Sequence, residues 1–488
     1  MRLKMKYWRQ ILVGAAVAAS IFSFGGCNKN NDGNTSETDS LKRDLIIKNY
    51  LKSEYMDVYY YWSDYVPDNV NASSMSIYDY FDALLYSKDR WSWMMDRDNY
   101  ITMATGTVSS SFGVSYGQMV KYYGDYDIRV KYVIEGGPMY NAGVRRGWVL
   151  DSLGGKEMMS AIRDGTYQTL MSTSPQTFTF TDLEGKNHAL KVTAGNFSSK
   201  SYFKYCLFTS ADFPGLTSPV GYFNYRSFME QKLGEMGEAM AYFKKSGIKD
   251  LILDLRYNGG GDGEASQKLA DYLAPASANG DVYAVRSHNA LLTKEGWNSE
   301  SKIARNDTSL NLDHLYIITT SGTASASEVI LNGLKPLMNV TQVGDTTYGK
   351  PNGMYVFFYP GTSEERKEID SGNYSNLEYC FLPICFYTDN KLGEGHYENG
   401  IVPDNYRPDD LCHDFGVDED NIKACLTHIV TGSFPALPSI KKSASAASGG
   451  ISRNRAIFDD SKLQPEFGMY ILRPDEEQVE ALDKSLGK

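Results

Sequence analysis

The sequence is poor in residues that bind metal ions or build disulfide frameworks. It has six cysteines and six histidines among 488 residues, with no Cys-x-x-Cys pair and no metal-ligand spacing between the two types. Five of the cysteines follow residue 200, and an odd number cannot pair completely within one molecule. We therefore expect no metal site and no cofactor, and mostly free thiols with one bridge at most, for which Cys412 and Cys425 are candidates.

Long apolar runs and an excess of positive charge are also missing. Beyond the first 26 residues, no segment is long and apolar enough to predict a transmembrane helix. Those 26 residues carry four basic and no acidic side chains, which leaves 45 basic and 60 acidic side chains in the remainder. A surface with this charge disfavours nucleic acid, so we expect no nucleic-acid partner.

The amino terminus has the three-part layout of a secretory signal. Basic residues from Arg2 to Arg9 precede an apolar run from Ile11 to Phe24. At about 14 residues the run is too short to span a bilayer comfortably. The Gly25-Gly26-Cys27 that follows resembles a bacterial lipobox, although Phe24 stands where that pattern prefers an aliphatic residue.

The lipobox resemblance implies that residues 1–26 are a lipoprotein signal peptide and that Cys27 carries a lipid anchor. Residues 27–40 are then expected to be a flexible tether. The resemblance also implies a location in the bacterial cell envelope, with the chain attached to a membrane, the outer membrane being the expected one. An ordinary cleaved signal followed by a chance cysteine is the alternative.

The remaining chain divides into four stretches of different character. Residues 41–98 have apolar side chains at helical spacing and many aromatic residues, which predicts a small helical bundle. Residues 100–197 contain short β-type runs, and residues 198–430 are expected to form the main domain. Residues 431–488 are polar and are predicted to be a linker and tail, with a short ordered patch near 467–470.

A glycine-rich motif in the second stretch resembles the signature of bacterial PDZ domains. It runs from Gly137 to Leu150, with Trp148 where aspartate is usual. A PDZ module binds an extended peptide as an added strand and holds its terminal carboxylate on backbone N–H groups. The loop Ser111-Phe112-Gly113-Val114 resembles the carboxylate-binding loop, so Phe112, Gly113 and Val114 are candidate substrate-binding residues; an ordinary glycine turn is the alternative.

Two runs in the third stretch are apolar on both faces, at 251–255 and 315–318. Such runs predict buried strands of an α/β fold, whose sites gather where the strands end. The first is followed by Asn258-Gly259-Gly260-Gly261, a stretch that needs unusual dihedral angles or close approach by a ligand. No Gly-Lys-Ser/Thr follows, which excludes a Walker loop. Backbone N–H groups for an oxyanion and a plain flexible loop both remain open.

The second run is followed by Ser321 to Glu328 and then an apolar helix. Ser325 and Glu328 have the spacing of a capping box, so Ser325 could simply cap the helix. A serine at a helix start is also well placed for nucleophilic chemistry, provided that a base removes its proton. His288 and His314 are the closest histidines and lie in no recognisable triad. Lys350 is the alternative base, because burial can lower a lysine pKa by roughly 3–5 units.

Three motifs together resemble the carboxyl-terminal processing, or tail-specific, serine peptidases. They are Asp254-Leu255-Arg256-x-Asn258-x-Gly260-Gly261, Thr323-Ala324-Ser325-Ala326-Ser327-Glu328 and Tyr348-Gly349-Lys350. The resemblance implies Ser325 as the nucleophile and Lys350 as its base, with Gly260 or Gly261 and the N–H of Ala326 as oxyanion donors. It also implies a crotonase- and ClpP-like βα catalytic core, preceded or interrupted by the PDZ-like domain.

The expected activity is that of a serine endopeptidase acting on exported polypeptides recognised by their carboxyl-terminal tails. One residue departs from the family pattern, since Met354 stands where a glutamine often orients the lysine. Two alternatives remain, a catalytically inactive PDZ-containing binding protein and a Ser/Lys hydrolase of a non-peptide ester or amide. A second Ser-Ala-Ser run at 443–445 has no apolar strand before it and is interpreted as linker.

Overall fold

The computed structural model describes residues 35–122, 125–359, 367–369, 371–437 and 469–486. The predicted signal peptide, Cys27 and the first part of the predicted tether lie outside the described residues. Within these ranges, no helix has both the length and the hydropathy needed to cross a membrane.

The main domain is built on a six-stranded sheet that contains both of the predicted buried strands. Its order is β10-β11-β12-β16-β17-β22, and all neighbours are parallel except the antiparallel pair β10–β11. The strands are β10 (Tyr202–Phe208), β11 (Val220–Tyr225), β12 (Asp250–Asp254), β16 (His314–Thr319), β17 (Val340–Gly344) and β22 (Asn405–Tyr406). The two predicted runs are the adjacent strands β12 and β16, with Leu251 beside Leu315, so their carboxyl ends meet at one edge.

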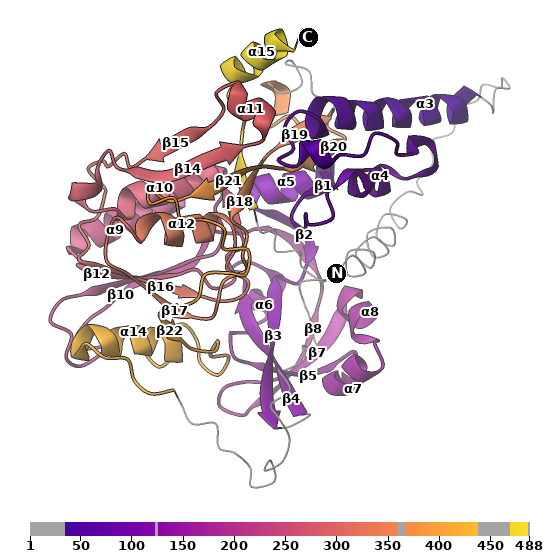
Figure 1. The fold of residues 1–488 in the computed structure, drawn as a ribbon. Coiled ribbons are helices and arrows are strands. Elements are labelled where there is room, and N and C mark those ends of the chain that lie inside the picture. Colours follow the sequence, from indigo (N-terminus) through magenta and orange to yellow (C-terminus); the bar gives the residue numbers. More distant parts are fainter. Residues whose placement is uncertain (1–34, 123–124, 360–366, 370, 438–468, 487–488) are drawn as a thin grey trace, which may run out of the picture.

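A second six-stranded sheet lies across a layer of helices from the first (Figure 1). Its order is β13 (Gly260–Asp262), β23 (Met469–Leu472), β18 (Asn352–Tyr355), β21 (Ile384–Asp389), β14 (Val282–His288) and β15 (Ser299–Lys302). Helices α9 (Leu233–Ser246), α10 (Gly263–Leu273) and α12 (Ala326–Leu334) lie between the sheets, and α14 (Asp420–Thr431) covers the far face of the first sheet. The predicted mixed α/β multidomain fold is confirmed.

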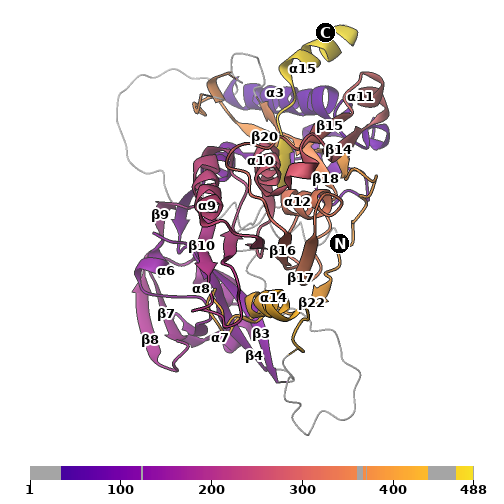
Figure 2. The same ribbon diagram turned by 90° about the vertical axis from the view of Figure 1, so that its left-hand side faces the viewer.

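Residues 107–198 form a separate β unit that projects from one end of the main domain (Figures 1 and 2). Its sheet has β3 (Val114–Tyr122), β4 (Asp125–Val133), β5 (Val149–Leu153), β7 (Gln176–Thr181) and β8 (Asn187–Val192), with β6 (Lys156–Glu157) paired to β5. Helices α6 (Pro138–Asn141), α7 (Met158–Arg163) and α8 (Tyr167–Ser172) complete it around its own apolar core. Strands β2 (Thr107–Ser111) and β9 (Gly195–Ser198) pair where the chain enters and leaves the unit, which is thus inserted into the chain of the larger body.

The amino-terminal region is helical but is not a separate bundle, which corrects the prediction for residues 41–98. It contains α3 (Thr35–Tyr50), which begins inside the predicted tether, a π-helical turn (Leu51–Met56) and α4 (Ile77–Leu84). Strand β1 (Trp93–Asp96) pairs with β20 (Tyr379–Leu382), which also pairs with β19 (Phe357–Tyr359). The Tyr55 ring stacks on Phe357 at 4.4 Å, so the aromatic residues join the main hydrophobic core. Helical spacing predicted the helices but carried no information about this strand pairing.

The end of the chain returns to the main domain, which corrects part of the predicted tail. Strand β23 lies between β13 and β18 and is parallel to both, and α15 (Glu476–Ser485) follows it. A four-residue strand paired with distant segments has too short a pattern to be recognised from local sequence. The run at 443–445 lies outside the described residues.

Candidate active site

Ser325 lies in the turn between β16 and α12, at the carboxyl edge of the central sheet. Its backbone has φ 60° and ψ −114°, a conformation that side-chain-bearing residues rarely adopt. The turn is held by Thr323 Oγ1 donating to the Leu255 carbonyl at 2.7 Å and by the Ala324 N–H donating to the Asn258 carbonyl at 3.1 Å. Strained backbone of this kind persists only where the surroundings over-determine it, and it is concentrated at functional sites.

The Ser325 hydroxyl is fully buried and has no hydrogen-bond partner in the described part of the chain. Glu328 accepts the Ser325 N–H at 2.7 Å, so the carboxylate half of the capping box is formed. The Glu328 N–H faces the hydroxyl in the arrangement of a capping box but makes no hydrogen bond of normal geometry with it, and a buried unpaired hydroxyl in a folded protein requires an explanation. A nucleophile waiting for a base is one such explanation.

Lys350 is buried at the start of the segment that leads into β18, with 2% of its surface exposed. Burial lowers the pKa of its amine to about 7, although the negative charges of Asp89 and Glu328 act in the opposite direction. A substantial fraction of the amine is therefore neutral near pH 7 and can accept a proton.

The amine of Lys350 donates to the sulfur of Met354 at 3.5 Å. Met354 thus contacts the lysine from the position where the resemblance leads us to expect glutamine. Because the Ser325 hydroxyl has no hydrogen-bond partner among the described residues, the serine and the lysine are not hydrogen-bonded in this conformation. Catalytic hydrogen bonds are often long or unformed in free enzymes and tighten when substrate binds.

A buried carboxylate, Glu328, joins the two segments that carry Ser325 and Lys350. Its Oε2 accepts the N–H of Ser325 at 2.7 Å and that of Lys350 at 2.9 Å. Its Oε1 accepts the Gly349 N–H at 2.7 Å and the Thr347 hydroxyl at 2.6 Å. Burial raises the pKa of this carboxyl, against hydrogen bonds that lower it. The capping-box spacing pointed to Glu328, but no sequence pattern indicated its contacts with residues 347–350.

The three candidate oxyanion donors lie around the same turn, and one of them is already engaged. The Gly260 N–H donates to Asn258 Oδ1 at 2.9 Å, so it would have to exchange this acceptor for a substrate oxygen. Gly261 has φ 139°, and a Cβ there would lie 2.1 Å from the Phe228 carbonyl, so glycine is required. Ala326 is the first residue of α12, where a backbone N–H has no acceptor within the helix.

The predicted substrate-binding loop lies in the β unit, away from Ser325 in the sequence and in the fold. Phe112 packs on Phe178 at 5.1 Å, and Gly113 has φ 70°. The Phe112 and Gly113 carbonyls accept the N–H groups of Met139 and Ile134, and the Gly113 N–H donates to Ser111 Oγ at 3.1 Å. Val114 begins β3, whose pairing partner is β4. The loop contains a glycine turn at Gly113, and its role in substrate binding stays a prediction.

The motif around Arg256 has a structural role that the sequence did not reveal. Arg256 is fully buried and forms ion pairs with Asp254 at 2.6 Å and Glu419 at 2.5 Å. Arg146, from the β unit, bonds the neighbouring Tyr257 hydroxyl at 2.7 Å. This network fixes the segment just before the glycine loop. Glu419 lies 163 residues from Arg256 in the sequence, so no local pattern connects the two.

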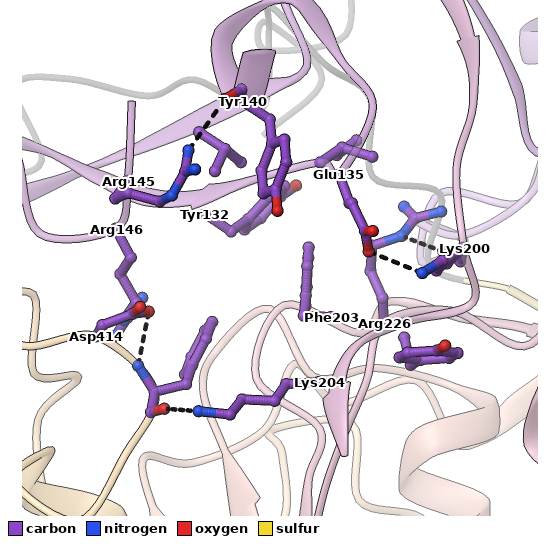
Figure 3. A pocket seen from close by; sticks show the side chains of 14 residues that line it. Tyr132, Glu135, Tyr140, Arg145, Arg146, Lys200, Phe203, Lys204, Arg226 and Asp414 are labelled. Carbon is purple, nitrogen blue, oxygen red and sulfur yellow. Dashed lines mark hydrogen bonds and ion pairs between the residues drawn. The ribbon is translucent and has the colours of Figure 1, made fainter. Parts of the chain in front are cut away.

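A cavity of about 240 Å³ separates the β unit from the main domain (Figure 3). Arg145 and Tyr140 line it from the β unit, and Phe203 and Lys204 line it from β10. Five basic and two acidic side chains contribute to its wall. Neither Ser325 nor Lys350 lines it.

Neither of the two histidines nearest in sequence approaches the serine. His288 bonds the Tyr355 hydroxyl at 2.8 Å and His314 bonds Thr341 at 2.8 Å. Burial lowers the pKa of both rings to about 4. The cysteines at 206, 380, 385, 412 and 425 are free thiols, so Cys412 and Cys425 form no bridge.

Comparison with protein-family models gives two matches. Residues 219–369 match peptidase family S41, and residues 53–93 match the peptidase S41 N-terminal domain. The first match contains Ser325 and Lys350, and the second contains the segment from the π-helical turn to the start of β1.

The chain is also similar to curated relatives and to solved structures. A protein of Staphylococcus saprophyticus named "Probable CtpA-like serine protease" is 25% identical over 217 residues, which are 42% of this chain and 39% of the relative. A protein of the same name from Staphylococcus aureus strain N315 is 22% identical over 455 residues, 86% of this chain and 79% of the relative. A crystal structure from Bacteroides fragilis assigned to the S41 proteases has a TM-score of 0.61 at 18% identity, and covers 83% of this chain and 98% of that one. This last likeness shows a shared fold.

Proposed function

We propose that this chain, which matches peptidase family S41 over residues 219–369, hydrolyses peptide bonds with Ser325 as nucleophile and Lys350 as general base. One observation carries the proposal. A buried, unpaired serine hydroxyl and a buried lysine with a pKa of about 7 lie on two segments that one carboxylate, Glu328, holds together.

The proposed reaction is acyl transfer to serine. The neutral amine of Lys350 accepts the proton of the Ser325 hydroxyl as Oγ forms a bond to the carbonyl carbon of the substrate. The N–H of Ala326, with that of Gly260 or Gly261, stabilises the resulting oxyanion. The lysine ammonium gives its proton to the leaving amine as the C–N bond breaks. Water, deprotonated by the same lysine, then releases the acid product and restores the serine.

The dyad must close before this reaction can occur. The lysine amine now contacts the Met354 sulfur, a weak acceptor that is easily given up. Rotation about the side-chain torsions of Lys350, or about χ1 of Ser325, requires no change in the backbone of the site. Substrate binding, which also displaces Asn258 from the Gly260 N–H, is the event that we expect to favour the closed arrangement.

The proposed substrates are exported polypeptides, recognised by their carboxyl-terminal tails in the inserted β unit. The PDZ-like motif at 137–150 and the glycine turn at Phe112, Gly113 and Val114 support this part of the proposal. Cys27 is the proposed lipid anchor, and the bacterial cell envelope the proposed location, on the strength of the amino-terminal sequence.

A catalytically inactive binding protein is the second candidate. It is favoured by the Met354 contact, because a thioether cannot orient an amine as firmly as an amide oxygen can. The inactive candidate and the enzyme differ in one measurable property, the reactivity of the Ser325 hydroxyl.

The test uses a fluorophosphonate probe together with degradation of casein and of a small ester. The full chain should be labelled and should cleave casein, and Ser325→Ala and Lys350→Ala should do neither. Ser443→Ala, in the second Ser-Ala-Ser run, is the matched control and should behave as the wild type. Labelling without casein cleavage would favour a hydrolase of non-peptide bonds, and absence of labelling would favour the binding protein.

A further inference from the structure

The peptide unit that joins Gly349 to Lys350 is held at both of its polar ends. Its carbonyl, from Gly349, accepts a hydrogen bond from the Arg90 guanidinium at 3.0 Å. Its N–H, from Lys350, donates to Glu328 at 2.9 Å. Because a peptide unit is planar and rigid, fixing both ends fixes the N–Cα bond of Lys350, and only the rotation φ about that bond then remains to set where the side chain leaves the backbone.

Arg90 is itself fixed by contacts on several sides. The same nitrogen, Nη2, also donates to the Glu398 carbonyl. The guanidinium carbon lies 4.7 Å from the Trp91 ring centroid and 5.7 Å from that of Tyr348. A Cβ on Gly349 would lie 2.4 Å from the Glu398 carbonyl, so the lysine segment and the segment at 398 are packed backbone to backbone under the arginine.

The residue before Arg90 fixes the loop that carries it. One carboxylate oxygen of Asp89 accepts the N–H groups of Trp91 and Ser92 at 2.8 and 3.0 Å, and the other accepts the buried Tyr60 hydroxyl at 2.7 Å. The hydroxyl of Ser92 accepts the Ile384 N–H of β21 at 2.8 Å. The loop from Asp89 to Ser92 is therefore tied both to the amino-terminal region and to the sheet that contains β18.

We propose that Arg90 is a positioning residue for Lys350, supplied by the amino-terminal region across 259 residues of sequence. This inference rests on the proposed function, since it concerns the base of the Ser325–Lys350 pair. Position 354 offers the amine a thioether as acceptor, so the backbone from which the side chain leaves contributes to the placement of the amine. Arg90 acts on that backbone from one side, and Glu328 acts on it from the other.

Small displacements of a reacting group are costly, and about 1 Å can lower a rate about 100-fold. We therefore expect Arg90→Gln to lower kcat about 10- to 100-fold with KM little changed, because the substrate-binding surface remains. Arg90→Lys, which can still donate to one carbonyl, should retain more activity than Arg90→Gln. The rate of phosphonylation of Ser325, measured under single-turnover conditions, should fall in parallel with kcat.

Chemical rescue separates positioning from a general structural role. Guanidinium ion at millimolar concentration should restore part of the activity of Arg90→Ala and none of that of Lys350→Ala. Arg97→Gln, which removes an exposed arginine of the same region paired with the adjacent Asp98, is the control and should match the wild type in rate and in melting temperature.

Wild-type rates in all Arg90 variants would overturn the proposal. So would a loss of activity that follows melting temperature and is not rescued by guanidinium, or a rise in KM with kcat unchanged, which would make Arg90 a substrate-binding residue. A wild-type chain that neither cleaves casein nor reacts with the probe would instead refute the proposed function, and this inference with it.

Discussion

The backbone N–H groups of Ser325 and Lys350 donate to the same oxygen atom, Oε2 of Glu328, at 2.7 and 2.9 Å. The main chains of the proposed nucleophile and base are thus fixed relative to each other by one carboxylate oxygen, while their side chains make no hydrogen bond to each other. This arrangement keeps the two residues close while leaving the proton-transfer contact free to form when substrate arrives.

Glu328→Gln should destabilise the protein and remove most of its activity. The carboxylate accepts four donors, whereas a glutamine side chain would direct an NH₂ group at some of them. Each buried group left unpaired costs about 1–3 kcal/mol, so we expect the free energy of unfolding to fall by about 2–4 kcal/mol. Urea unfolding measures the effect, with Glu238→Gln on the exposed face of α9 as the control. Equal unfolding midpoints for Glu328→Gln and the wild type would contradict the assigned role.

The pH dependence of peptidase activity should follow the protonation of the Lys350 amine. The amine must be neutral to accept the serine proton, so kcat/KM should rise with pH through a value near the Lys350 pKa of about 7. The Asp89 carboxylate raises that pKa, and Asp89→Asn should therefore move the rise to lower pH. Asparagine keeps an oxygen for the N–H groups of Trp91 and Ser92. Asp64→Asn, at an exposed position, is the control; a shift of the Asp89→Asn profile to higher pH would refute this electrostatic account.

Lys350→Met should stabilise the protein while abolishing catalysis. The folded-state pKa is about 7 and the ordinary value is 10.5, so below pH 7 both states bind the proton and the folded state bears the full cost of a buried charge. Between these two values only the unfolded state binds the proton, so wild-type stability rises with pH and the advantage of the variant shrinks. Urea unfolding at pH 6, 8 and 10 tests this, with Lys245→Met on α9 as the control. A constant difference across the three pH values would show that the lysine is not buried as a charge.

Strong local patterns made the central part of the fold and site predictable. Apart from Asp254, the segments at 251–255 and 315–318 are apolar on both faces, a pattern typical of a buried strand. They are neighbours, β12 and β16, in the central sheet. Because sites collect at the carboxyl ends of such strands, the glycine loop and the Ser325 turn were expected together, and the carbonyl of Asn258 accepts the Ala324 N–H. The resemblance to the tail-specific peptidases then pointed to Lys350, in the segment that Glu328 joins to the turn.

Contacts made over long sequence distances were not predictable in the same way. Arg90 donates a hydrogen bond to the carbonyl of Gly349, which is 259 residues away in the sequence, and Arg256 donates to Glu419, which is 163 residues away. Neither pair has a local periodicity or motif that connects its members. An ordered patch near 467–470 was expected, but not that it includes a strand, because the four residues of β23 are too few to define a period. The place of β23 between β13 and β18 depends on partners that are distant in the sequence.

Removal of β23 should impair both stability and activity. This strand pairs with β13, which contains Gly260 and Gly261, and with β18, which follows Lys350. A chain that ends after Leu437 would leave both strands with unpaired backbone groups at the site. A chain that ends after Arg473 keeps β23 and loses α15, and it should retain more activity than the shorter chain. Casein cleavage and melting temperature compare the two, and equal activity in both would show that β23 is not needed for the site.

Replacing Ser325, the proposed nucleophile, should reveal the strain of its backbone conformation. Ser325→Ala removes a buried hydroxyl that has no hydrogen-bond partner in the described part of the chain, so the variant should be more stable than the wild type. Ser325→Gly also relieves the positive φ of 60°, which costs a residue with a side chain about 1–3 kcal/mol. The free energy of unfolding should therefore be lowest for the wild type, higher for Ser325→Ala and highest for Ser325→Gly, and both variants should be inactive.

Ser327→Gly is the matched comparison. Ser327 lies within α12 and its hydroxyl donates to the Asn258 carbonyl at 3.0 Å, so glycine at this position should destabilise the protein. If glycine at position 325 were the least stable of the three chains, the turn would not be strained, and its geometry would not be maintained at the expense of stability.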